Sequence, residues 1–300
     1  MESKFSHLPD IKTIQPDRLI KYRVSEDKFS AEVLLPGLSY TDFDQKIGGK
    51  MTLWSLAKLH DCVRSTAWFQ GFNYFQDLYH PGCSITLFEV KQVFTLSREA
   101  HDVKFSSYFC LNKPQRFLLH VSHVGQTTFT LVIDWFNEIN VKIGSFSSKL
   151  CNVDRKSRRP TPLPDAFSKK NMDDHFKKYP MTSLPKSDSQ QMSNFAFSFN
   201  TKALYSDCDQ NNHVNQTTYV RWCSDAGAAG AIHGHFKQFE NFLEKYAVKS
   251  IEMNFVGEAL VNDDILINVW ENENESSCLM FSIGKEGKEI FNMKMTFYSM

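Results

Sequence analysis

The sequence lacks the features that would tie it to a disulfide framework, a membrane or secretion. Its seven cysteines are scattered, with no Cys-x-x-Cys pair, a pattern typical of reduced thiols in a cytosolic protein. No apolar run reaches the roughly 18 residues that a membrane span needs. The opening residues, MESKFSHLPDIKTIQ, have no apolar signal-peptide core. We therefore expect a cytoplasmic protein without a membrane span.

The sequence also has no excess of either charge. Its 34 basic residues balance its 34 acidic ones, so a nucleic-acid partner is not expected. One basic run, RKSRR at Arg155–Arg159, stands beside prolines, and we interpret it as part of a solvated linker. The sequence contains no G-x-S-x-G elbow, Walker loop or H-E-x-x-H motif, which removes the signatures of three large enzyme classes.

Phenylalanine, in contrast, is abundant, with 26 residues in a chain of 300. Aromatic residues favour strands and supply large apolar surfaces. The composition therefore indicates strands packed on an apolar interior that can hold a ligand.

The chain also contains an internal repeat. YTDFDQKIGGKMTLW, residues 40–54, is similar to YSDCDQNNHVNQTTY, residues 205–219, at an offset of 165 residues. A strand-like run precedes each copy, at Phe29–Leu35 and at Phe195–Leu204. A helix-like segment follows each copy, at Lys50–Arg64 and at Val214–Ile232. Long-period similarity of this kind indicates two copies of one structural unit.

Further strands are predicted after each helix. In the first half they cover residues 84–96, 104–111, 116–125, 127–136 and 141–153, and in the second 248–260, 264–272, 276–287 and 288–298, with a hairpin turn at Gly284–Lys288. One strand, one helix and then a meander favour an α+β fold with a long helix on an antiparallel sheet. We place the domains at residues 1–165 and 194–300, joined by a linker at 166–193 that is polar and contains proline.

The second copy carries a motif that the first lacks. The run Asp209-x-Asn211-x-His213 resembles the active-site run of the hotdog-fold thioesterases, above all the acyl-ACP thioesterases of plants and bacteria, which carry two tandem hotdogs in one chain. In the segment IEMNFVGEAL, Glu258 stands at the position of the family's catalytic glutamate, and Ala259 stands where the family has a cysteine. The resemblance implies two tandem hotdog domains, each with a long central helix wrapped by an antiparallel sheet.

The first copy departs from this motif. In a gapless alignment Lys46, Gly48 and Lys50 stand opposite Asn211, His213 and Asn215. The resemblance therefore implies a degenerate N-terminal domain and one working site in the C-terminal domain.

Thioester hydrolysis explains why these residue types would gather. Asp209 or Glu258 can act as the general base or attack directly, and the sequence leaves this choice open. Asn211 can orient the water or a carboxylate, and His213 can exchange protons near neutral pH. We expect the helix to begin near Val214 and the amides of Val214 and Asn215 to form an oxyanion hole. This chemistry needs no metal and no organic cofactor.

Other residues of the motif have structural roles in our interpretation. Asp207 is expected to hold the loop through backbone contacts, and Asn212 is expected to cap the helix. Asn215 is expected either to stand at the start of the helix or to orient the substrate. Tyr219 and Trp222 are spaced to enter the core on one helical face. A cysteine nucleophile at Cys208 or Cys223 is a competing assignment, although Cys223 falls well inside the helix.

The predicted function is that of an acyl thioesterase that cleaves fatty or related acyl groups from acyl carrier protein or coenzyme A. Two alternatives stay open at this point. One is a hotdog hydratase or dehydratase that uses Asp61 on the first helix, and the other is a non-catalytic acyl-thioester-binding protein. A compact monomer and a homodimer of such chains are both compatible with the sequence.

Overall fold

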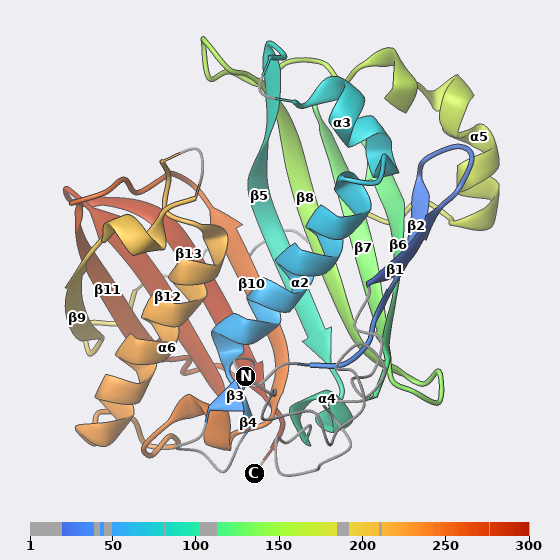
Figure 1. Ribbon diagram of the computed structural model, residues 1–300. Coiled ribbons are helices and arrows are strands. Elements are labelled where there is room, and N and C mark those ends of the chain that lie inside the picture. Colours follow the sequence, from blue (N-terminus) through green and yellow to red (C-terminus); the bar gives the residue numbers. More distant parts are fainter. Residues whose placement is uncertain are drawn as a thin grey trace, which may run out of the picture.

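The computed structural model describes residues 20–38, 43–44, 50–80, 82–102, 113–184, 192–209, 212–275 and 277–299. These residues contain one continuous antiparallel sheet of eleven strands, and two long helices lie side by side on one of its faces (Figure 1). The strand order is β1-β2-β6-β7-β8-β5-β10-β13-β12-β11-β9. No helix in the described segments is long and apolar enough to cross a membrane.

Six strands of this sheet come from the first half of the chain and five from the second. The first six are β1 (Lys21–Val24), β2 (Ser30–Leu35), β5 (Ile85–Leu96), β6 (Gln115–Val124), β7 (Thr128–Phe136) and β8 (Lys142–Asp154). The other five are β9 (Phe197–Lys202), β10 (Val248–Phe255), β11 (Asp264–Glu271), β12 (Cys278–Lys285) and β13 (Lys288–Phe297). A separate small ladder joins β3 (Phe43–Asp44) to β4 (Lys50–Met51).

One long helix covers each half of the sheet. They are α2 (Leu53–Trp68) and α6 (Gln216–Ile232). Shorter helices are α3 (Phe75–Leu78), α4 (Arg98–Asp102) and α5 (Lys169–Lys178). Single 3₁₀ turns occur at Phe72–Tyr74, Asp165–Phe167, Tyr205–Asp207 and Leu243–Lys245. The predicted α+β order of strand, helix and antiparallel meander is thus confirmed in both halves.

The predicted elements agree with the observed ones to within a few residues, because their periodicity is strong. The predicted strand at residues 104–111 lies outside the described residues, and β1 was not predicted. At the predicted hairpin turn, Glu286 and Gly287 both have positive φ, 51° and 73°. These values are those of a two-residue type I′ turn, which matches the twist of the flanking strands.

The phenylalanines lie where the helices meet the sheet. Phe117, Phe129 and Phe146 are fully buried on the inner face of the first half, and Phe281 and Phe291 occupy the same face of the second. Their burial removes large apolar surfaces from water and contributes to the driving force for this packing.

The two halves meet at the pairing of β5 with β10. Five residue pairs, from Thr95↔Ser250 to Lys91↔Asn254, extend one half-sheet into the other. Helices α2 and α6 are in contact above this junction. As a result, any site beside the start of α6 also borders the first half.

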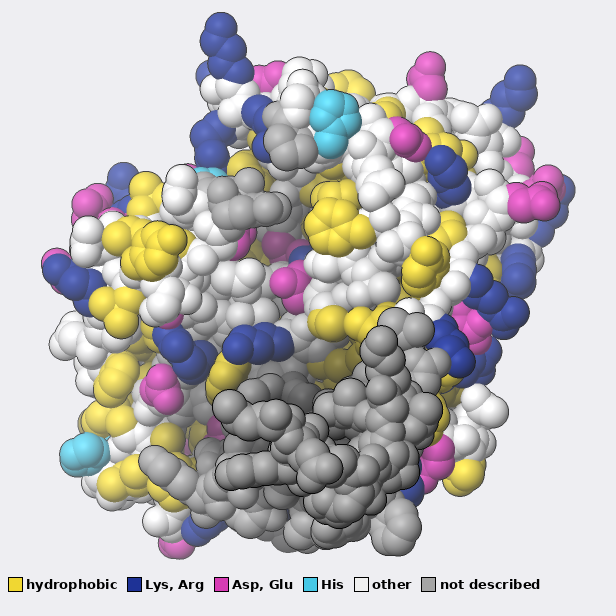
Figure 2. All heavy atoms as spheres, viewed as in Figure 1, with side chains coloured by type: hydrophobic (Ala, Val, Ile, Leu, Met, Phe, Trp, Pro, Cys, Tyr) yellow, Lys and Arg dark blue, Asp and Glu magenta, His cyan; other side chains and the backbone are white. Residues whose placement is uncertain are grey.

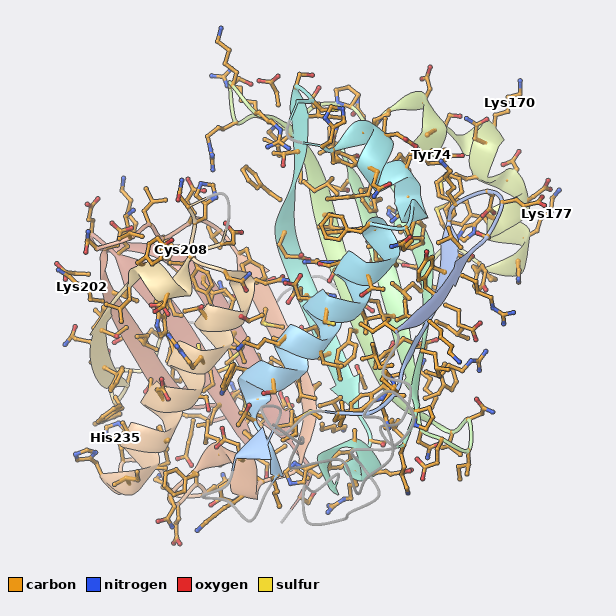
Figure 3. The ribbon with its side chains drawn as sticks, viewed as in Figure 1. Tyr74, Lys170, Lys177, Lys202, Cys208 and His235 are labelled. Atoms are coloured by element: carbon orange, nitrogen blue, oxygen red, sulfur yellow. The ribbon has the colours of Figure 1, made fainter. Side chains whose placement is uncertain are left out.

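The first part of the predicted linker is folded. Met172 and His175 of α5 are buried, and a ring nitrogen of His175 lies 2.7 Å from the carbonyl oxygen of Val121 on β6. In Figure 3 the labelled side chains of Lys170 and Lys177 on the same helix point away from the sheet. Helix α5 therefore belongs with the first half, while the domain boundaries at residues 165 and 194 stay a prediction.

Candidate active site

The loop that leads into α6 is held by a buried aspartate. The carboxylate of Asp207 is buried, accepts the Leu204 N–H at 2.9 Å and forms an ion pair with Arg221 on α6. Its backbone carbonyl accepts the Asn215 N–H at 2.8 Å. The predicted structural role of Asp207 is confirmed by these contacts, because they tie both ends of the loop to the first turns of the helix.

The next residues form a tight hairpin in which the backbone of Asp209 lies opposite that of His213. Cys208 pairs with Val214, and the Asp209 N–H donates to the His213 carbonyl at 2.8 Å. Asn212 closes the turn with a φ of 61°, so the prediction that it caps the helix is wrong. Asn215 is the cap, since its side-chain oxygen accepts the Thr217 N–H at 2.9 Å. The predicted site residue Asn211 lies outside the described residues.

Glu258 reaches this hairpin from the loop after β10. His213 pairs with Leu260, and the Val214 N–H donates to the Ala259 carbonyl at 2.9 Å. These backbone bonds bring His213 Nδ1 to 3.5 Å from Glu258 Oε2. Two residues that are 45 positions apart in the sequence therefore form one imidazole–carboxylate pair, and Asp209 stands on the hairpin beside it.

A buried tyrosine on α6 accepts a hydrogen bond from the loop that carries Glu258. The Ala259 N–H donates to the Tyr219 hydroxyl oxygen at 3.0 Å. Burial raises the pKa of Tyr219 to about 12, so the hydroxyl stays neutral. Tyr219 and Trp222 are both 3% exposed, which confirms their predicted place in the core.

Side chains from the first half of the chain also lie next to the His213–Glu258 pair. Arg158, in the turn after β8, forms an ion pair with Glu258, and its guanidinium carbon lies 4.8 Å from the centre of the Phe88 ring. The Phe88 ring is in turn 6.4 Å from that of His213. Residues 156–159 are exposed, as predicted, but the interpretation of Arg155–Arg159 as part of a linker is wrong, because the run forms an ordered turn that contacts Glu258. This contact could not be predicted from the sequence, because it depends on how β5 pairs with β10.

The two amides predicted to form the oxyanion hole are already paired. The Val214 N–H donates to Ala259 and the Asn215 N–H to Asp207. Helix α6 begins at Gln216, two residues later than expected. The roles of Val214 and Asn215 stay a prediction, and the geometry favours the Gln216 N–H, which at the first helical position has no intrahelical acceptor.

The cysteines near the site are poorly suited to act as nucleophiles. Burial raises the pKa of the Cys208 thiol, and the neighbouring carboxylates of Asp207 and Asp209 raise it further. Cys223 is fully buried inside α6, and burial raises its pKa well above the usual value. Because the thiolate is the reactive form, the competing cysteine assignment is disfavoured. Figure 3 places Cys208 beside the first turn of α6, far from His235 at the other end.

The repeated hairpins differ in length at the site itself. Phe43 pairs with Met51 in the first half, and Cys208 pairs with Val214 in the second. Phe43 and Cys208 are 165 residues apart, whereas Met51 and Val214 are 163 apart, so the first loop is two residues longer. The structure therefore places Lys50, and not Gly48, at the position that corresponds to His213. The degenerate copy lacks a histidine in either alignment.

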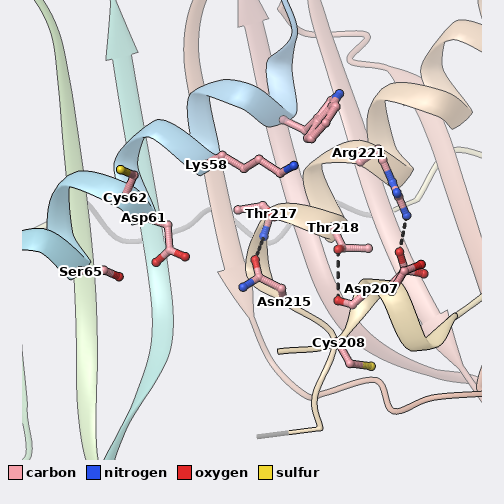
Figure 4. A pocket seen from close by; sticks show the side chains of 12 residues that line it. Lys58, Asp61, Cys62, Ser65, Asp207, Cys208, Asn215, Thr217, Thr218 and Arg221 are labelled. Carbon is pink, nitrogen blue, oxygen red and sulfur yellow. Dashed lines mark hydrogen bonds and ion pairs between the residues drawn. The ribbon is translucent and has the colours of Figure 1, made fainter. Parts of the chain in front are cut away.

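A cleft of about 420 Å³ lies between α2 and α6. Figure 2 shows a hollow between the two halves on this face, and Figure 4 shows the side chains of both helices that line the cleft. At its edge, Asp61 accepts hydrogen bonds from Gln216 Nε2 at 3.1 Å and from Arg64 at 2.9 Å. The lining residues are Trp54, Lys58, Asp61, Cys62, Ser65, Ser206, Asp207, Cys208, Asn215, Thr217, Thr218 and Arg221.

Comparison with known proteins extends this picture. Residues 190–299 match the sequence model of the acyl-ACP thioesterase C-terminal domain. The C-terminal half is thus similar in sequence to acyl-ACP thioesterases. No curated protein sequence matched the chain.

The whole chain resembles solved acyl-ACP thioesterases in fold. An acyl-ACP thioesterase from Bacteroides thetaiotaomicron superposes with a TM-score of 0.65 at 17% identity, covering 92% of this chain and 100% of that one. A 12:0-ACP thioesterase from Umbellularia californica gives a TM-score of 0.65 at 9% identity, covering 90% and 97%. The predicted arrangement of two tandem hotdog domains is confirmed by these likenesses.

Proposed function

We propose that this protein hydrolyses acyl thioesters, carried by acyl carrier protein or coenzyme A, to a free acid and a thiol. The observation that carries the proposal is the pair of His213 and Glu258, 3.5 Å apart, at the loop before α6. The sequence similarity of residues 190–299 supports it. The site lies in the C-terminal half and is bordered by the first half.

The chemistry requires one proton acceptor and one proton donor. A carboxylate, that of Glu258 or Asp209, takes a proton from water, and the resulting hydroxide adds to the thioester carbonyl carbon. The tetrahedral intermediate then expels the thiolate, which takes up a proton from the site. His213, whose Nδ1 lies 3.5 Å from Glu258 Oε2, can pass a proton between that carboxylate and the leaving sulfur. Asn211 would orient the water.

The carbonyl oxygen needs a donor as its negative charge develops. We assign this role to the N–H of Gln216, which has no hydrogen-bond acceptor among the described residues, beside the predicted Val214 and Asn215 amides, which donate to Ala259 and Asp207 in this structure. The Gln216 side chain bonds to Asp61 and Gln92 of the first half, which restrains the start of the helix. An oriented donor of this kind contributes about 3–4 kcal/mol to transition-state stabilisation in comparable enzymes.

The test is a hydrolysis assay with acyl-CoA and acyl-ACP thioesters of short, medium and long chains. Asp209→Asn, His213→Ala and Glu258→Gln are expected to lower kcat by roughly a hundredfold or more, since general acid–base groups contribute on this order. Thiol release is followed with a chromogenic disulfide. The same panel shows which carrier and which chain length the enzyme prefers.

Matched variants away from the site provide the controls. Asp264→Asn changes an exposed carboxylate on β11, and His233→Ala changes an exposed histidine at the end of α6. Both are expected to retain the rate of the unmodified protein. Unchanged rates in Asp209→Asn and His213→Ala would contradict the site assignment.

A second candidate function is hydration or dehydration of an acyl thioester. It is favoured by one observation, the position of Asp61 at the cleft, in contact with Gln216 at the start of α6. Incubation with an enoyl thioester distinguishes the two reactions, because a hydratase adds water to the double bond and releases no thiol. Tight binding of acyl-CoA without turnover of either substrate would indicate the remaining alternative, a non-catalytic acyl-thioester-binding protein.

A further inference from the structure

Backbone hydrogen bonds hold the turn after β8, which carries Arg158, in one conformation. Val153 pairs with Pro160 across the turn, the Arg158 N–H donates to the Asp154 carbonyl at 2.8 Å, and the Asp154 N–H donates to the Arg159 carbonyl at 3.0 Å. The Asp154 carboxylate also accepts the N–H of Ser157 at 2.7 Å. These bonds fix the backbone from which Arg158 projects.

The backbone of Arg158 itself is in the left-handed region. Its φ is 57°, a conformation that glycine or asparagine adopts at much lower cost. A turn of this shape would therefore form more easily with glycine at this position. Strain of this kind, where it is observed, points to a role for the side chain.

The guanidinium of Arg158 contacts the proposed catalytic pair. It donates to Oε2 of Glu258, the same oxygen that lies 3.5 Å from His213 Nδ1. Phe88 on β5 lies under the guanidinium at 4.8 Å, a cation–π distance, and its ring also neighbours that of His213. Among the described residues, both polar contacts fall on Oε2, which leaves Oε1 to receive a proton from water.

We propose that Arg158 is a positioning residue for Glu258, and that the degenerate half completes the site of the other half in this way. The ion pair orients the carboxylate toward His213, and Phe88 restrains the guanidinium. This inference rests on the proposed function, since the orientation matters only if Glu258 takes part in the reaction. It also gives the first domain a role that does not require its own motif.

A different role for Arg158 would be to attract acidic substrates through its charge alone. Arg159 provides the matched control, because it is exposed, adjacent and equally charged, and Arg159→Gln removes the same charge from the same turn. A steering role predicts a higher KM in both Arg158→Gln and Arg159→Gln. A positioning role predicts a lower kcat in Arg158→Gln alone.

In the hydrolysis assay we expect Arg158→Gln to lower kcat roughly tenfold to a hundredfold, as small misplacements of a catalytic group do, with KM nearly unchanged. Arg158→Lys keeps the charge without the planar fork and should recover part of the loss. In the Glu258→Gln background, Arg158→Gln should add little further loss, because the two residues act through one group. An unchanged kcat in Arg158→Gln, or an equal loss in Arg159→Gln, would overturn the inference.

A measurement independent of activity separates this inference from the proposed function. The carboxyl ¹³C resonance of Glu258, assigned by its loss in Glu258→Gln, should shift in Arg158→Gln and stay in place in Arg159→Gln. If the unmodified protein hydrolyses no thioester but this shift occurs, the contact stands and the proposed function fails. A resonance that does not move in Arg158→Gln overturns the inference whatever the activity.

Discussion

At the scale of single residues, the motif contains two aspartates with different surroundings. Asp207 is 2% exposed and bonded to a backbone N–H and an arginine, whereas Asp209 is half-buried on the hairpin that carries His213. The contacts of Asp207 are therefore structural, whereas Asp209 is partly exposed to solvent.

The role of Asp207 can be tested through stability. Asp207→Ala removes a buried partner of Arg221 and leaves the Leu204 N–H without its acceptor, so we expect the free energy of unfolding to fall by about 3 kcal/mol. Urea unfolding measures this loss. The exposed Asp264→Ala should change stability by less than about 0.5 kcal/mol. A loss in Asp207→Ala no larger than that of Asp264→Ala would show that the contact is not structural.

Single residues also mark the limit of prediction from sequence. His213 and Glu258 were predicted because a motif and a short alignment carry their identity, and the structure brings them together. Arg158 and Phe88 could not be predicted as neighbours of the site, since their contacts arise from strand pairing between distant segments. The interpretation of Arg158 from local composition was wrong because proline and charge describe the chain nearby and not what the chain packs against.

At the scale of elements, the two helices occupy equivalent places but pack differently. Helix α6 carries Gly227 and Gly230 where it approaches its neighbours, while α2 buries His60 and Arg64 at the sheet. The ring of Phe236 would lie 2.6 Å from a β-carbon at Gly230. The close approach of α6 therefore depends on the missing side chain.

We predict that Gly230→Ala destabilises the protein although alanine favours helices. The gain in helix propensity is about 1 kcal/mol, whereas overpacking against a buried aromatic ring costs about 1–3 kcal/mol. We expect a net loss of about 1 kcal/mol in thermal or urea unfolding. In a Phe236→Leu background the same substitution should become neutral or stabilising. A stabilised Gly230→Ala in the unmodified background would contradict this packing argument.

Elements were the most predictable part of this molecule. The two long helices and most strands follow from periodicity, which is set by the sheet and helix geometry itself, whereas α3, α4 and α5 were not predicted. The start of α6 was misplaced by two residues, because several residues in NNHVN can cap a helix and only the tertiary contacts select Asn215. The two-residue difference in hairpin length could not be seen in the sequence either, because the identical residues on both sides of the loop align without a gap.

At the scale of the whole molecule, the buried His60 and the partly buried His120 link stability to pH. Burial lowers the pKa of His120 to about 4, against the opposing effect of Asp134, while His175 and Lys142 lower it further. Burial also lowers the pKa of His60 well below its usual value. Both histidines are therefore neutral in the folded protein at pH values where they are protonated in the unfolded chain.

Stability should consequently fall as the pH drops below about 6.5, the ordinary histidine pKa. For His120 the loss continues to about pH 4, where the folded form also takes up the proton, and at pH 5 it amounts to about 2 kcal/mol. His120→Gln should lose less stability than the unmodified protein between pH 7.5 and pH 5. Urea unfolding at several pH values measures the difference, and parallel pH dependences would refute it.

The pairing of β5 with β10 has a consequence for how the site responds to dilution. In a dimer of separate hotdogs, the fraction of assembled sites would decrease as the protein concentration falls below the dissociation constant. Here both halves belong to one chain, so each experiences the other at an effective concentration on the order of millimolar. The proposed site therefore assembles by a first-order process, and the contact between Arg158 and Glu258 does not depend on the protein concentration.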